Sequence, residues 1–173
     1  MKFKILFTIL ISVIVLTSFT FPENLEKKID KEVVDVFGIN SFQFIPIEVS
    51  ENLNLKLPAK ITGQNLFKLI DGDTFFGYVF IDKANSKTAY FDYLVIFDND
   101  LTIRRSKVLI YREEYGGEIG SKRWLKQFEG KSSTDSLENI MAISGATISV
   151  NSMTNAINDL LKTINILYQN KVI

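Results

Sequence analysis

The chain contains no cysteine and no histidine among its 173 residues. Without cysteine it cannot form a disulfide, ligate an iron–sulfur cluster, act through a thiolate or carry a lipid on sulfur. Without histidine it lacks the commonest metal ligand and the usual general base. We therefore predict no metal site and no catalytic residue. Any difficult chemistry would have to come from a bound cofactor.

The chain also has no excess of either charge. Its 20 basic and 20 acidic residues cancel to a formal net charge of zero. Nucleic-acid-binding proteins usually carry a clear basic excess, so the composition predicts no nucleic-acid partner. No Gly-x-Gly-x-x-Gly motif is present either, which disfavours direct use of a nicotinamide dinucleotide. The sequence has no internal repeat and no low-complexity stretch.

The first 21 residues differ from the rest. Two lysines, Lys2 and Lys4, precede an uncharged and mostly apolar run of 17 residues, Ile5 to Phe21. This pattern is typical of a signal peptide, and the length sits at the lower limit for a membrane anchor. We predict a signal peptide or N-terminal membrane anchor over 1–21. The domain would then lie outside the cytoplasm, in the periplasm or on the outer face of the cytoplasmic membrane. A buried core helix is the alternative.

The remaining residues predict one α+β domain. Alternating aromatic and β-branched residues separated by polar turns indicate strands, and apolar residues spaced by three or four indicate helices. The strands follow one another closely enough to form an antiparallel meander sheet, packed with a few helices. The expected elements are a helix over 23–37, an edge strand over 41–49, strands over 74–81, 88–97 and 101–111, a short helix over 121–128 and a helix over 147–168, with 50–68 left ambiguous.

One motif near the end suits a phosphate. Ser144-Gly145-Ala146-Thr147, followed by Ile148 and Ser149, leads directly into the last helix. Small residues allow close approach of the backbone, and the free N–H groups and positive dipole end of a helix favour an anion. The same residues also fit an ordinary helix cap, a role open to both serines.

This tetrapeptide resembles the flavin-attachment motif of the FMN-binding domain family. That family includes the flavin-carrying subunits of the sodium-translocating NADH:quinone reductase and of the Rnf electron-transport complex. In it the FMN phosphate is esterified to the last threonine of the motif, which corresponds to Thr147. Three further stretches resemble the family in order and spacing: Gly77 to Val79, Asp98 to Ile103, and Trp124 to Lys131.

A fourth stretch, Arg112 to Gly120, resembles the family loop that lies beside the flavin, usually written Glu-Thr-Pro-Gly. Glu114 and Tyr115 replace the usual Thr and Pro, and a double glycine follows. Gly tolerates positive φ, so it can preserve the path of the loop. The residues that the resemblance predicts to bind FMN are Glu113, Glu114, Tyr115, Gly116, Gly117, Ser144, Gly145, Ala146, Thr147, Ile148 and Ser149.

The resemblance implies an organisation and a function. We expect an N-terminal helix and edge strand over 22–68, an FMN-binding domain over 69–168 and a tail over 169–173. The implied protein is an exported electron carrier with FMN linked to Thr147. Its partners would be a flavin transferase and redox proteins of the membrane or periplasm. Met141 replaces the Asp usual at that position, so a noncovalent FMN-dependent reductase and an FMN-free binding or scaffold module remain alternatives.

Overall fold

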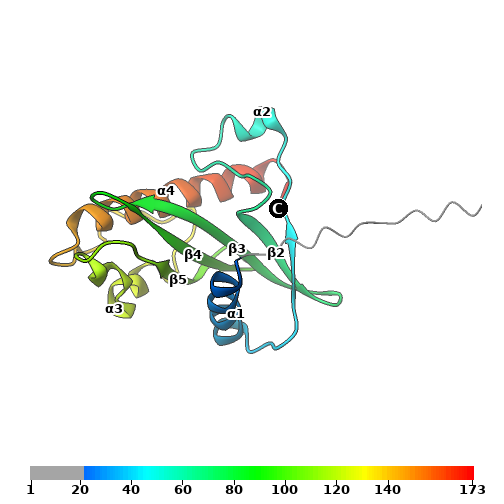
Figure 1. Cartoon of the computed structure of the whole chain (residues 1–173). Coiled ribbons are helices and arrows are strands. Elements are labelled where there is room, and N and C mark those ends of the chain that lie inside the picture. The colour runs from blue at the N-terminus through cyan, green and yellow to red at the C-terminus, as the bar shows by residue number, and fades with distance from the viewer. Residues whose placement is uncertain (1–21) are drawn as a thin grey trace, which may run out of the picture.

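The computed structural model describes residues 22–173, and the predicted signal or anchor segment lies outside this range. An antiparallel sheet forms the centre, with helices on both of its faces (Figure 1). The elements in chain order are α1 (Glu23–Phe37), β1 (Gln43–Pro46), α2 (Glu51–Asn54), β2 (Leu66–Asp71), β3 (Thr74–Asn85), β4 (Tyr90–Asp98), β5 (Ile103–Ile110), the 3₁₀ turn η1 (Gly117–Gly120), α3 (Lys122–Leu125), the 3₁₀ turn η2 (Lys126–Phe128) and α4 (Thr147–Gln169).

The sheet is a five-stranded meander in the order β1-β2-β3-β4-β5, with every neighbouring pair antiparallel. The predicted α+β class and meander are therefore confirmed. β1 lies at the edge, where Pro46 costs no ladder hydrogen bond to a further strand. The sequence missed β2, a six-residue strand, because Gly63 and Asn65 break the pattern just before it.

The sheet is buried on both faces by different helices. Phe91, Tyr93, Val95 and Phe97 of β4 pack on the side of α4, while the alternate residues of the same strand pack with α1. A strand places successive side chains on opposite faces, so one apolar strand can serve two helices. The sheet is therefore the middle layer of three.

Helix α4 carries the largest share of one core. Its predicted inward-facing side chains are all buried, which confirms the helical period of the sequence. The opposite side of the helix is polar and exposed. The seven buried residues predicted for this face are Val150, Met153, Ile157, Leu160, Leu161, Ile164 and Leu167.

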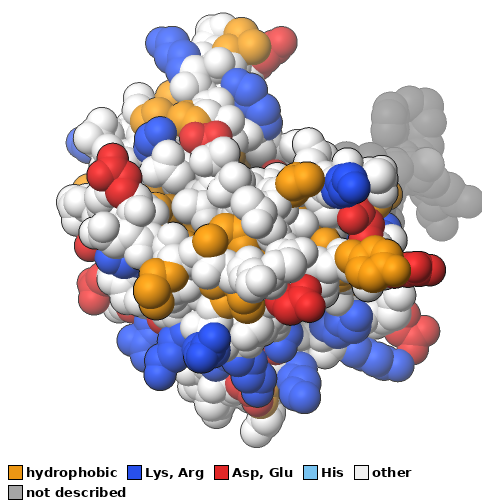
Figure 2. Space-filling model, turned by 90° about the vertical axis from the view of Figure 1, so that its left-hand side faces the viewer, with side chains coloured by type: hydrophobic (Ala, Val, Ile, Leu, Met, Phe, Trp, Pro, Cys, Tyr) orange, Lys and Arg blue, Asp and Glu red, His pale blue; other side chains and the backbone are white. Residues whose placement is uncertain are grey.

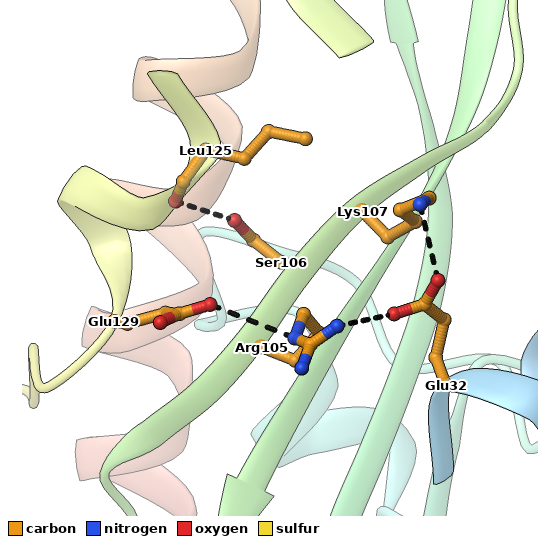
Figure 3. Close-up of polar contacts among 6 residues, drawn as sticks. All are labelled: Glu32, Arg105, Ser106, Lys107, Leu125 and Glu129. Carbon is orange, nitrogen blue, oxygen red and sulfur yellow. Dashed lines mark hydrogen bonds and ion pairs between the residues drawn. The ribbon is translucent and has the colours of Figure 1, made fainter. Parts of the chain in front are cut away.

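Helix α1 covers the other face and brings a buried acid with it. Glu32 ion-pairs with Arg105 at 2.7 Å and with Lys107 at 3.1 Å, and Arg105 also approaches Glu129 at 3.5 Å (Figure 3). Ser106, between the two cations on β5, points the other way and donates to the carbonyl of Leu125 at 3.0 Å. Two of the charges that interrupt the predicted strand 101–111, those of Arg105 and Lys107, therefore serve the contact with α1, whereas Arg104 lies 3.7 Å from Asp98.

Several boundaries differ from the expectation by a few residues: β1 is shorter than 41–49, β4 and β5 begin two residues later than predicted, and the predicted helix 121–128 is α3 followed by η2. Two of these differences are set by turns. β3 continues to Asn85, and the turn lies at 86–89, where the N–H of Ser86 donates to the carbonyl of Ala89 at 2.9 Å. β5 begins at Ile103 because Leu101 turns the chain with a φ of 61°. Between residues 22 and 173, no helix combines the length and the apolar character needed to cross a membrane.

Candidate functional site

The start of α4 leaves backbone donors unpaired. The helix begins at Thr147, and its first helical hydrogen bond runs from the N–H of Val150 to the carbonyl of Ala146 at 2.8 Å. Within residues 22–173, the N–H groups of Thr147, Ile148 and Ser149 have no acceptor, and no side chain caps the helix. The ordinary-cap interpretation of Ser144 and Ser149 is therefore wrong. These donors, together with the helix dipole, are suited to an anion.

A hollow of about 280 Å³ opens at this helix end. It is near the lower end of the ~300–1,000 Å³ typical of ligand pockets. Its wall is formed by the turn between β3 and β4, the segment that follows β5, and the start of α4. Tyr115, in the segment after β5, is 83% exposed. The residues that line it are Lys87, Tyr111, Glu113, Tyr115, Gly116, Gly145, Ala146, Thr147, Ile148 and Ser149.

The structure therefore brings most of the predicted site residues together. Eight of the eleven line the hollow, and Ser144, Glu114 and Gly117 do not. Two residues that line it, Lys87 and Tyr111, were not predicted. Lys87 lies on a hairpin turn and Tyr111 just after β5, and no local pattern in the sequence connects either position with the start of α4.

Tyr111 joins the loop wall to the helix wall. Its hydroxyl donates to the carbonyl of Tyr115 at 2.9 Å, so it accepts from the Ser149 hydroxyl, 3.1 Å away. Gly116 has a φ of +87°, and a Cβ there would lie 2.5 Å from the Tyr111 hydroxyl oxygen. Any other residue there would have to displace the Tyr111 hydroxyl and adopt a strained left-handed backbone. Gly117, by contrast, has open space beside it and begins the 3₁₀ turn η1.

Glu113 holds the turn between β3 and β4. Its Oε1 accepts from the Ser86 hydroxyl at 2.6 Å and from the N–H groups of Thr88 and Ala89 at 2.6 and 2.9 Å. These donors, that of Ser86 first, lower the pKa of the Glu113 carboxyl from 4.5 to about 2. Glu113 is thus ionised at neutral pH and fixes the turn that carries Lys87.

The segment before the motif is fixed to α3 by hydrogen bonds. The carbonyl of Met141 accepts from Trp124 Nε1 at 2.7 Å, and its N–H donates to Gln127 Oε1 at 2.8 Å. The side chain of Met141 is 71% exposed. Its backbone is therefore held in place, whereas its side chain is free to meet another molecule.

The chemistry of this donor set fits a flavin mononucleotide. Three free N–H groups, the Thr147 hydroxyl and the Lys87 ammonium suit a phosphate. Tyr111, Tyr115 and Ile148 offer apolar surface to an aromatic ring system. Two residues of the lining, Gly116 and Gly145, carry no side chain, so the backbone itself is open to a ligand there.

Comparison with known families agrees with this geometry. Residues 90–162 match the FMN-binding domain family. This match confirms the predicted family for that part of the chain, and all eleven predicted site residues lie inside it. Residues 90–162 are thus an FMN-binding domain, and the match supports FMN as the cofactor. No curated protein matches the chain.

Proposed function

We propose that this chain is an exported electron-carrying flavoprotein whose FMN is joined through its phosphate to the hydroxyl of Thr147. The observation that carries the proposal is the position of this hydroxyl. Thr147 is the first residue of α4, is exposed, and lies in the same hollow as the unpaired N–H groups of the helix end. Those N–H groups would offset the negative charge of a phosphoester.

The attachment needs an activated donor, because an alcohol and a phosphate do not condense spontaneously in water. The Thr147 oxygen would attack the flavin-side phosphorus of a flavin dinucleotide. The new O–P bond would replace the pyrophosphate bond, and a nucleoside monophosphate would leave. A flavin transferase would accept the hydroxyl proton. The chain supplies no histidine or cysteine for this step, which favours an external enzyme.

Once bound, FMN supplies reversible one- and two-electron chemistry, and the chain itself need only hold it and tune its potential. Glu113, the acidic residue among those that line the hollow, is occupied by the turn and so is not free to take a proton from a substrate. A carrier between redox proteins suits this arrangement better than a self-sufficient enzyme.

Charge on the neighbouring surface suggests what such partners look like. Lys122, Arg123 and Lys126 lie on α3 and η2, close after the Gly116 loop, and form no ion pair within the described part of the chain. Lys and Arg side chains gather along one side of the face shown in Figure 2. We propose that acidic surfaces of redox proteins approach here, steered by charge.

Met141 favours an alternative in which FMN binds without a covalent bond. If the transferase requires the acid that the family usually carries at this position, FMN would bind here without a covalent bond. The exposed Met141 side chain supports this alternative, because it offers the transferase no carboxylate. The chain would then resemble a noncovalent FMN-dependent reductase.

Colour and mass after denaturation separate these possibilities. The full chain is produced together with a flavin transferase, denatured, and measured by absorbance and mass spectrometry. We expect yellow colour that stays with the chain, with an added mass of one FMN moiety that is lost in Thr147→Val. Thr154→Val is the matched control, since its hydroxyl lies on the same helix and has no hydrogen-bond partner within residues 22–173. It should keep the added mass.

The opposite results are equally clear. Colour released on denaturation would show noncovalent FMN and overturn the ester. A colourless protein under every condition would favour the FMN-free scaffold. Retained mass in Thr147→Val would place the attachment on another residue.

A further inference from the structure

Lys87 is the cation of the FMN hollow. It stands on the turn between β3 and β4, three residues before the start of the family match at 90. Among the lining residues it carries the positive charge, and Glu113 carries the negative charge. Within residues 22–173 its ammonium makes no hydrogen bond and no ion pair. This charge is therefore available to a ligand.

The charges around the hollow make such a cation useful for an anionic ligand. Glu113 is ionised, and neutral hydroxyl and N–H groups solvate it instead of a cation. A second carboxylate, that of Glu118, lies beside Gly145, within 3.6 Å of where a Cβ would stand. Arg112, one residue before Glu113, is paired with Asp92 and lies over the ring of Tyr90. A phosphate entering the hollow would thus meet the Glu113 carboxylate in its lining, with that of Glu118 nearby beside Gly145, and Lys87 is the cation in the lining.

The position of Lys87 is fixed by its neighbours in sequence. The side chain of Ser86 and the backbone N–H groups of Thr88 and Ala89 all donate to one oxygen of Glu113. Lys87 lies between these anchored residues. Its backbone is held, so less freedom is lost when its side chain binds an anion.

We propose that the Lys87 ammonium binds the phosphate of FMN, opposite the N–H groups of Thr147, Ile148 and Ser149. The inference rests on the proposed function, because it takes FMN as the ligand of this hollow. It assigns a binding role to a residue outside the family match. The phosphate would then be held between a fixed helix end and a fixed hairpin turn.

The test uses the full chain produced without a flavin transferase, so that FMN remains free. Binding of FMN and of riboflavin, which lacks the phosphate, is measured by quenching of flavin fluorescence. We expect Lys87→Gln to weaken FMN binding by about tenfold, as for loss of a charged hydrogen bond, and to leave riboflavin binding unchanged. Lys87→Arg should retain most of the affinity. Lys56→Gln removes the same charge from an exposed position near α2 and should bind FMN like the unmodified chain.

The outcomes distinguish this inference from the function on which it rests. Unchanged FMN binding in Lys87→Gln, or an equal loss for FMN and riboflavin, would overturn the role of Lys87 alone. If the unmodified chain binds neither flavin, this inference fails, whereas the proposed function fails only if the chain also gains no FMN when it is produced together with a flavin transferase. Equal thermal unfolding of the variants excludes a folding defect.

Discussion

Two polar clusters of this molecule differ in how completely they are paired. At the contact of α1 with β5, Glu32 meets Arg105 and Lys107, and Arg105 also approaches Glu129. At the start of α4, three N–H groups and the Lys87 ammonium have no partner within the described residues. The first cluster is a closed contact between a helix and a sheet. The second cluster has unpaired hydrogen-bond donors, so it is the one able to bind a ligand.

The largest effect should come from breaking the closed cluster. Glu32→Gln removes the charge that Arg105 and Lys107 face, and breaking a buried pair costs ~3–5 kcal/mol. The two cations are each 28% exposed, so we expect a smaller loss of about 2 kcal/mol. Urea unfolding measures it.

FMN binding by Glu32→Gln should be unchanged, since the site lies on another part of the molecule. Glu23→Gln is the control, because its pair with Lys27 is fully on the surface, and it should cost less than about 0.5 kcal/mol. Equal unfolding curves for the two variants would contradict the importance of the closed cluster.

A smaller effect is expected where the open cluster depends on a glycine. Gly116→Ala forces a Cβ onto the Tyr111 hydroxyl in a left-handed backbone, which should cost about 1–2 kcal/mol. It should also weaken FMN binding, because the Tyr111 bridge between Tyr115 and Ser149 would be displaced.

Gly117→Ala provides the matched control one residue further on. A Cβ there meets no atom within 4 Å, so stability should change by less than about 0.5 kcal/mol. Chemical denaturation and flavin titration test both variants. Equal effects of the two alanines would refute the role of the Tyr111 contact.

The smallest effect is a pH dependence from Glu113. Its pKa is lowered from 4.5 to about 2 in the fold, so its contribution to stability is complete above pH 4.5 and is lost as the pH falls towards 2. Glu113→Gln should reduce the change of the melting temperature with pH between pH 4.5 and about 2. Glu114→Gln, which removes a neighbouring exposed charge, should melt like the unmodified chain. A Glu113→Gln profile that keeps its full slope would rule out the contribution of this carboxyl.

The sequence predicted best what a local pattern encodes. The spacing of apolar residues in α4 identified the residues that are buried, and the small residues before it identified the N-terminal end of the helix, where the candidate site lies. The residues that complete the site come from distant parts of the chain. Tyr111 meets Ser149 across 38 positions, and outside the site Glu32 meets Arg105 across 73. Such contacts form only when the strands have paired into the sheet, so the local spacing of apolar residues in the sequence could not predict them.

The boundaries of the hairpin show the same limit. The predicted strands over 74–81 and 88–97 leave the connection between them as a turn, yet β3 runs on to Asn85 because β4 pairs with it that far. The turn at 86–89 depends on Glu113, more than twenty residues later. The position of Lys87 therefore depends on the Glu113 carboxylate, and no local sequence pattern connects these two residues.

The size of the hollow has a consequence for how electrons would travel. At about 280 Å³ it is too small to enclose a three-ring heterocycle together with its sugar and phosphate. Much of the ring would stand outside the protein wall, beside the exposed Tyr115. A visiting protein could then touch the redox-active edge directly, with no tunnel to enter and no lid to open. Dioxygen would have the same easy access, so the reduced form should oxidise quickly in air.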